Sequence, residues 1–169
     1  MIQISAENIN RTSPYQVKTL DELSVSFVTD YGISYDIGFY EDRLFNMPEA
    51  YHFYISNANK QHAQNDPKVL QTVMAVIEEF FRQDPLVMLY ICDPRDHRQA
   101  ARNRLYRQWF ENYSNNCHFR LYSESVVYKS VAYYAGLIMR NDNPYYDEVV
   151  AAFHDIVGYL PEQMVGNKT

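Results

Sequence analysis

The chain has 169 residues, 47% of them hydrophobic and 21% charged, and it is rich in aromatic residues, with 16 Tyr and 9 Phe against 5 Gly. A chain of this length can bury a sizeable core without a disulfide or a metal, so we expect a single domain over residues 1–169, with an N-terminal extension to residue 22, a core over residues 23–159 and a tail from residue 160. The net charge of −6 argues against nucleic acid as a partner. No apolar run approaches the roughly 20 residues that a bilayer requires, and no signal segment opens the chain, so we expect no membrane partner and a cytoplasmic location.

Alternating apolar residues predict an antiparallel group of strands in the first third of the chain. Residues 23–28 and 33–39 each place apolar side chains on one face, and Gly32 supplies the positive φ of a hairpin turn between them. A third strand is expected over residues 51–56, and a short extra strand near residues 15–18. We expect these strands to form a sheet with one buried face.

A helix and a buried strand are predicted next. Asp66 is placed to cap a helix whose first residue is Pro67, and apolar residues then recur at helical spacing while polar residues such as Glu79 mark an exposed face. The continuous apolar run of residues 86–92 is typical of a central strand that is covered on both sides.

The second half of the chain is predicted to alternate helix and strand. Asp96 and Gln99 form an approximate capping box that opens a helix ending near Tyr113. The side chains expected to be buried on this helix are Ala100, Ala101, Leu105, Tyr106, Trp109 and Phe110. The remaining elements are strands over residues 118–123 and 126–139 and a last helix over residues 145–159. The order β-β-β-α-β-α-β-β-α predicts an α+β fold with a mixed, largely antiparallel sheet and packed helices.

The most distinctive segment lies where the buried strand ends and the next helix begins. It holds five of the 15 basic residues of the chain within residues 95–107, and anions and other ligands bind beside helix N-termini at the carboxyl ends of strands. Arg98 and Arg102 are one helical turn apart, and Asp93 and Asp96 precede them. We take these four residues as a candidate patch for a ligand or partner. The alternative is structural: Asp96 caps the helix, and Asp93 pairs with a neighbouring arginine.

Several kinds of site have no signature in this sequence. The five His residues lack the spacing of metal ligands, so we expect no metal. No serine lies in a nucleophile elbow, and no glycine-rich loop for a nucleotide phosphate is present. The tyrosine pairs Tyr133–Tyr134 and Tyr145–Tyr146 fit either internal packing or a homodimer interface through the long last strand.

From the first predicted strand onward, the order of elements resembles the core of the GCN5-related N-acetyltransferase superfamily. In that family the helix after the central strand commonly reads N-x-x-A-x-x-x-Y-x-x-x-G-F, and Ala101, Trp109 and Phe110 take its alanine, glycine and phenylalanine positions. The family's tyrosine, a general acid for the departing thiolate, falls on Leu105 in this register, with Tyr106 one position further along. The resemblance implies Tyr106 as the candidate catalytic acid.

The resemblance also implies a cofactor, acetyl-CoA, and a place for it. The family's pyrophosphate loop, V-x-x-x-x-R/Q-x-x-G-x-G/A, would lie between the third strand and the first helix. Its positions are taken here by Ser56, Gln61, Gln64 and Asp66. Both small residues are therefore replaced, and Asp66 adds a negative charge. The cofactor contacts that the resemblance implies are Asn57, Gln61 and Lys68.

The segment from Cys92 to Phe110 also resembles a bacterial family of uncharacterised small proteins, which has no assigned activity. Two hypotheses follow, and the sequence does not decide whether the protein is an enzyme. The first is an acetyltransferase-like domain, either an atypical acyl-CoA-dependent N-acyltransferase or an inactive relative. The second is a non-enzymatic protein-interaction module that contacts its partner through the arginine-rich helix and the tyrosine-rich last strand.

Overall fold

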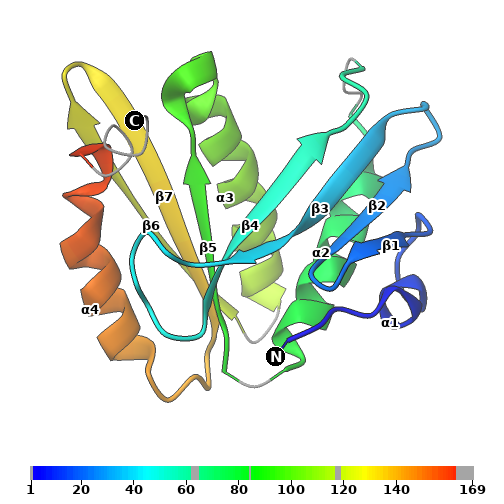
Figure 1. Ribbon diagram of the computed structural model, residues 1–169, viewed down its shortest axis with the longest axis horizontal. Helices are drawn as coiled ribbons and strands as arrows, with labels where there is room; N and C mark the ends of the chain where they lie inside the picture. Colours follow the sequence, from blue (N-terminus) through cyan, green and yellow to red (C-terminus); the bar gives the residue numbers. More distant parts are fainter. Residues whose placement is uncertain (1, 62–64, 84, 117–118, 163–169) are drawn as a thin grey trace. The chain divides into compact units, whose positions relative to one another are not determined.

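The computed structural model in Figure 1 describes residues 2–61, 65–83, 85–116 and 119–162. Its elements in chain order are α1 (Ala6–Asn10), β1 (Lys18–Asp21), β2 (Ser24–Val28), β3 (Ser34–Glu41), β4 (Ala50–Asn57), α2 (Pro67–Phe81), β5 (Val87–Cys92), the 3-10 turn η1 (Pro94–Asp96), α3 (Gln99–Asn116), β6 (Phe119–Tyr128), β7 (Val131–Arg140) and α4 (Tyr146–Val157). The strands form a seven-stranded sheet in the order β1-β2-β3-β4-β5-β7-β6. The predicted α+β class and mixed sheet are confirmed. The nine predicted elements correspond in order to the strands and α-helices from β2 to α4.

The chain divides into two compact units. The first unit comprises Met1–Tyr40 and Phe53–Asp84, and the second unit comprises Glu41–His52 and Pro85–Thr169. In the second unit, the first three residues of β4 pair in parallel with the start of β5, and β5 pairs antiparallel with β7. A parallel pair of strands needs a long crossover connection, and α2 lies in the connection from β4 to β5.

Helix α2 of the first unit begins and packs as the sequence predicts. The Asp66 carboxylate accepts a hydrogen bond from the backbone N–H of Lys68 at 3.0 Å, and Pro67 occupies the first helical position. The ring of Phe80 on α2 stacks on Phe39 of β3 with 4.2 Å between centroids. The apolar residues that α2 buries are Val69, Val73, Ala75, Val76, Ile77, Phe80 and Phe81.

The prediction that Glu79 lies on an exposed face of this helix is wrong, because helix α1 covers it. Glu79 is 5% exposed, and its Oε1 accepts hydrogen bonds from the backbone N–H of Ser5 at 3.2 Å and from Arg82 at 2.9 Å. Helix α1 has five residues and lies within the predicted N-terminal extension. The spacing of apolar residues along α2 therefore could not reveal that α1 packs on it. A charge is buried here with its partners, as buried charges in proteins usually are.

Strand β5 is covered on both sides in the second unit, as its continuous apolar run predicts. The Tyr90 ring lies over Gly136 of β7, and its hydroxyl donates a hydrogen bond to Oδ1 of Asn103 on α3 at 3.2 Å. On the opposite face, Leu89 belongs to a cluster that includes Phe153 and Val157 of α4. Both faces of β5 therefore need a helix, and the chain supplies α3 and α4.

Helix α3 begins later than predicted and buries a different face. It starts at Gln99 after the turn η1, and Asp96 accepts a hydrogen bond from the N–H of Arg98, so the capping-box prediction is wrong. Tyr106 and Phe110 are buried as predicted, whereas Leu105 is 42% exposed. Ala100 and Ala101 are also exposed, and Trp109 is partly buried. The helix carries apolar residues on more than one side, and the Tyr90 ring of β5 packs against the side that holds Tyr106 and Phe110.

The hairpin of β6 and β7 also departs from the predicted strand boundaries. The turn was expected near residues 124–125, but the strands run unbroken from Phe119↔Arg140 to Tyr128↔Val131. Lys129 and Ser130 form the turn with φ values of 50° and 63°. Glycine and asparagine are the usual residues in turns with positive φ, so Lys129 and Ser130 do not identify this turn in the sequence.

A buried carboxylate organises the connection from β3 to β4. Asp42 accepts hydrogen bonds from the backbone N–H groups of Leu44, Phe45 and Met47, each at 3.0 Å, and lies 2.8 Å from Nε2 of His52. Burial alone would raise the pKa of Asp42, but the hydrogen bonds from His52, Met47 and Phe45 outweigh it and hold this pKa below its usual value. The ionised carboxylate therefore stabilises the fold.

We predict that Asp42→Ala lowers the free energy of unfolding by about 2–4 kcal/mol, because three backbone donors lose their acceptor in a buried loop. Urea unfolding at neutral pH measures the change, with the exposed Asp147→Ala as the control. Since the pKa of Asp42 is lowered, its contribution is present above the unfolded value of about 3.9 and is lost as the pH falls through the folded pKa. A loss below about 0.5 kcal/mol would contradict this role.

The close approach of Tyr90 to Gly136 gives a second prediction. A Cβ added at Gly136 would lie 1.9 Å from Cε1 of Tyr90, a ring that is only 1% exposed, so the ring or the strand has to shift. Gly136→Ala should therefore destabilise the protein by about 1–3 kcal/mol. Gly158→Ala is the matched control, because nothing lies within 4 Å of its added Cβ. Thermal unfolding compares the two variants, and equal melting temperatures would show that the sheet accommodates the methyl group.

Candidate functional site

Two of the three predicted cofactor contacts, Asn57 and Gln61, lie at the end of β4 and just after it in the first unit. The side-chain N–H of Asn57 donates a hydrogen bond to the backbone carbonyl of Gln61 at 2.6 Å, so these two residues lie together. The Oδ1 atom of Asn57 is buried and has no hydrogen-bond partner within the described residues. Between them, Lys60 is exposed and has a φ of 55°. The segment thus offers one unused acceptor and one exposed cation.

Lys68 lies apart from these residues, in a charged cluster at the N-terminus of α2. Its Nζ is 2.9 Å from Oδ2 of Asp30 and 5.5 Å from the centroid of the Tyr15 ring. The hydrogen bond from Lys68 lowers the pKa of Asp30 and raises that of Lys68. Both side chains are at least half exposed, so water weakens the ion pair.

The Asp66 carboxylate occupies the position where a helix N-terminus would hold an anion. It caps α2 and also accepts a hydrogen bond from the Tyr15 hydroxyl. Burial and the neighbouring carboxylates raise the pKa of Tyr15 to about 12, so its hydroxyl remains a proton donor. No pattern in the sequence connects Tyr15 with this site, because the two residues are 51 positions apart along the chain.

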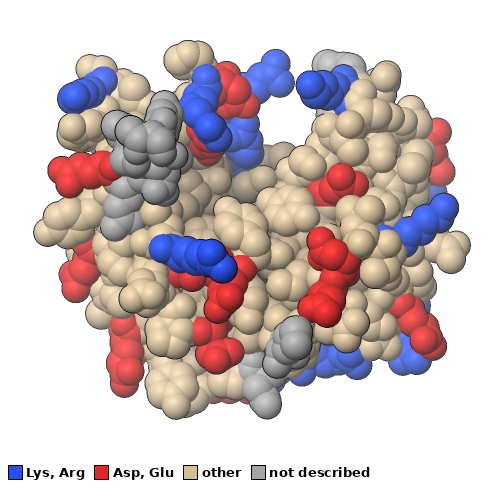
Figure 2. All heavy atoms as spheres, in the orientation of Figure 1, with Lys and Arg blue, Asp and Glu red and all other residues tan. Residues whose placement is uncertain are grey.

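The predicted patch after β5 is held together by ion pairs. Asp93 pairs with Arg95, Asp96 pairs with Arg102, and Arg102 also donates to the backbone carbonyl of Asp93 at 3.1 Å. The hydrogen bond from the Arg95 side chain lowers the pKa of Asp93, and that from the Arg98 N–H lowers the pKa of Asp96. In Figure 2, acidic and basic atoms lie side by side in this region. Three of the four predicted residues are thus brought together, and the Arg98 side chain is exposed outside the network.

Tyr106, the predicted catalytic acid, lies in an aromatic cluster between α3 and β5. It is 6% exposed, and its ring centroid lies 5.2 Å from that of Tyr90, 5.9 Å from Trp109 and 6.0 Å from Phe110. Burial raises the pKa of Tyr106 above its usual value, so the hydroxyl is protonated at neutral pH. Burial also raises the pKa of Cys92 to about 12, which leaves an unreactive thiol beside this cluster.

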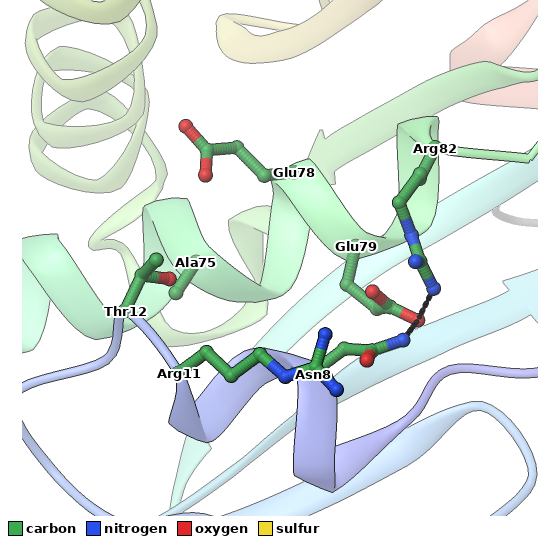
Figure 3. A pocket seen from close by; sticks show the side chains of 7 residues that line it. All are labelled: Asn8, Arg11, Thr12, Ala75, Glu78, Glu79 and Arg82. Carbon is green, nitrogen blue, oxygen red and sulfur yellow. Dashed lines mark hydrogen bonds and ion pairs between the residues drawn. The ribbon is translucent and has the colours of Figure 1, made fainter.

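A pocket of about 230 Å³ lies between α1 and α2 in the first unit (Figure 3). Glu79 and Asn8 are hydrogen-bonded at 3.4 Å on its wall. The pocket's other lining residues are Arg11, Thr12, Ala75, Glu78 and Arg82. Two arginines and two glutamates face it, so charge selects neither an anion nor a cation.

The β6–α4 contact contains a histidine and a glutamate that the sequence did not connect. Glu124 of β6 contacts Nδ1 of His154 on α4 and accepts a hydrogen bond from the Tyr122 hydroxyl at 2.5 Å. The hydrogen bond to Glu124 raises the pKa of His154.

Within the described ranges, no three His, Cys, Asp or Glu side chains gather as metal ligands. No described helix is long and apolar enough to cross a membrane.

The raised pKa of His154 predicts a pH-dependent contribution to stability. It is fully present below the unfolded pKa of about 6.5 and is lost as the pH rises through the folded value. His154→Gln should therefore lower the melting temperature more at pH 5.5 than at pH 8. The exposed His97→Asn is the control, and an equal loss at both pH values would exclude the charged pair as the cause.

Comparison with known proteins supports the expectation of a family without an assigned activity. A family model described as "Family of unknown function (DUF6169)" matches residues 65–155, which is more than half of the chain. The match extends from the cap of α2 into α4. No curated protein and no solved structure matches the chain. The chain therefore belongs to DUF6169, a family of unknown function.

Proposed function

We propose that this protein has an acyl-CoA N-acyltransferase type of fold and acts as an atypical acyl-CoA-dependent N-acyltransferase. The observation that carries the proposal is the strand order β1-β2-β3-β4-β5-β7-β6 with β4 and β5 in parallel. Helices α2 and α3 follow these two strands directly, as they do in the superfamily that the sequence resembles.

The proposal assigns cofactor contacts to Asn57, Gln61 and Lys68. The buried Oδ1 of Asn57 has no partner within the described residues and would accept an amide N–H of the pantetheine arm of acetyl-CoA only once it is uncovered. Lys68 is paired with Asp30 only at the surface, and exchanging that carboxylate for a phosphate costs little. The site is atypical because Asp66, and not a small residue, precedes α2.

Tyr106 is the general acid in this proposal. A general acid must hold its proton until the thiolate leaves, and the Tyr106 hydroxyl is protonated at neutral pH; burial, which raises its pKa, also makes it a weaker acid than an ordinary tyrosine. Tyr106 lies on the buried face of α3, whereas Leu105, which takes the position of the family's tyrosine, is exposed, and this favours Tyr106 over Leu105 as the residue next to a site. The proposal requires that the Tyr106 hydroxyl, whose side chain is buried among Tyr90, Trp109 and Phe110, reach the thiolate of the bound cofactor.

The first test is calorimetric titration of the protein with acetyl-CoA and with CoA. We expect binding in the micromolar range, weakened about threefold to tenfold by Lys68→Ala and strengthened by a similar factor by Asp66→Asn. Asparagine retains the helix cap, so the second variant removes only the charge. Lys18→Ala, which removes an exposed lysine on β1, is the matched control. No heat of binding at millimolar cofactor would overturn the proposal.

A second test separates catalysis from binding. With acetyl-CoA and a panel of primary amines, Tyr106→Phe should reduce thiol release by about a hundredfold or more and leave cofactor affinity unchanged. Trp109→Phe, which changes a ring in the same cluster without removing a tyrosine hydroxyl, is the control. An unchanged rate in Tyr106→Phe would assign this side chain to packing alone.

The alternative function is a non-enzymatic protein-interaction module, and one observation favours it. Arg98 and Arg104 are exposed and have no ion pair within the described part of the chain, whereas Arg95, Arg102 and Arg107 are paired. Such a surface suits an acidic peptide. Salt-dependent binding of a polyglutamate peptide that Arg98→Glu abolishes, together with no binding of CoA, would select this alternative.

A further inference from the structure

The two outer strands of the sheet differ in how they are protected against pairing with another chain. Strand β1 has four residues, its register with β2 shifts between Thr19 and Asp21, and charged residues stand at both its ends. Short length, irregular register and charge are the features by which proteins protect exposed sheet edges. Strand β1 is therefore a poor template for a further strand.

Strand β6 lacks the first two of these protective features, and its two charged residues, Arg120 and Glu124, have opposite signs. It has ten residues, contains no proline, and pairs with β7 without a register shift from Phe119 to Tyr128. Its last residues are also apolar and accessible, since Val127 is 69% exposed and Tyr128 is 36% exposed. A long and regular edge that no other described strand pairs with is a template for strand addition.

The turn fixes which backbone groups of β6 face outward. Lys129 and Ser130 both have positive φ, so the turn is of the two-residue type that closes on a hydrogen-bonded pair, here Tyr128↔Val131. Hydrogen-bonded pairs alternate along an antiparallel ladder, so the even-numbered residues of β6 bond to β7. The backbone N–H and C=O groups of Leu121, Ser123 and Ser125 therefore point away from β7.

The side chains of β6 make this edge complementary to itself. Arg120 and Glu124 are four residues apart, and an antiparallel copy centred on Tyr122 would place each arginine opposite the partner's glutamate. The opposed odd-numbered residues would then exchange the outward backbone hydrogen bonds. A copy centred on Glu124 would instead oppose two carboxylates, so charge selects the first register.

Both charged side chains can take part in such a pair. Glu124 contacts Tyr122 and His154 through Oε1, and no contact to its Oε2 occurs in the described ranges. Arg120 lies 5.0 Å from the centroid of the Tyr146 ring and has no ion pair among the described residues. We propose that β6 pairs antiparallel with β6 of a second copy of this chain, around a two-fold axis at Tyr122, with two Arg120–Glu124 pairs across the interface.

The test is the molar mass of the full chain, measured by sedimentation and by light scattering over a range of micromolar concentrations. We expect a species of twice the 20.0 kDa of one chain. Arg120→Glu and Glu124→Arg should each weaken dimerisation at least tenfold, because each brings like charges together. The double variant Arg120→Glu/Glu124→Arg restores opposite charges and should recover the dimer. The exposed Arg104→Glu is the control for the loss of a positive charge.

A backbone variant makes the test independent of the charges. The N–H of Ser123 faces outward, so Ser123→Pro removes a hydrogen bond to the partner and leaves the bonds to β7 in place. We expect a folded monomer, with the helical and strand content confirmed by circular dichroism. A wild-type chain that is monomeric at every concentration would overturn the proposal. So would a dimer that survives Ser123→Pro and both charge reversals, or single variants that lose the dimer while the folded double variant does not regain it.

Discussion

The second unit depends on one constraint, namely that β5 is buried on both faces. Its odd and even residues point to opposite sides, so Leu89 needs an apolar partner on one face and Tyr90 on the other. Phe153 of α4 meets the first requirement, and Tyr106 and Phe110 of α3 meet the second. The positions of both helices, and of the residues they carry, follow from the sequence of this one strand.

The parts of the fold that the sequence predicted are those with a local physical cause. A continuous apolar run identified β5, and Asp66 and Pro67 identified the start of α2. The parts that it missed depend on tertiary contacts. The turn at Lys129 and Ser130 has no glycine or asparagine, and the inner face of α3 is determined by its contact with the Tyr90 ring of β5. Competing local and tertiary preferences of this kind are the usual reason for such errors.

The candidate site follows the same division. The sequence placed Asp93, Asp96 and Arg102 together because they are close along the chain, and the ion pairs among them are local. It could not reveal that the Tyr15 hydroxyl donates a hydrogen bond to Asp66, or that Glu79 accepts one from Ser5 at the start of helix α1, because those partners are far apart in sequence. Carboxylates stand at both helix starts that a phosphate would approach. The proposed acyl-CoA site therefore has little positive charge for a phosphate, which is why the proposal rests on the sheet order and not on a phosphate loop.

The most direct test of the acyltransferase account is amide hydrogen exchange of the whole chain with and without acetyl-CoA. The account predicts slower exchange in the segment from Asn57 to Gln61 and in the first turn of α2 at Lys68, since ordering by a bound ligand reduces local opening. Peptides from β6 and β7 should serve as the internal reference. Binding of acetyl-CoA that leaves exchange unchanged in these two segments would contradict the account, because the cofactor would then occupy a different part of the protein.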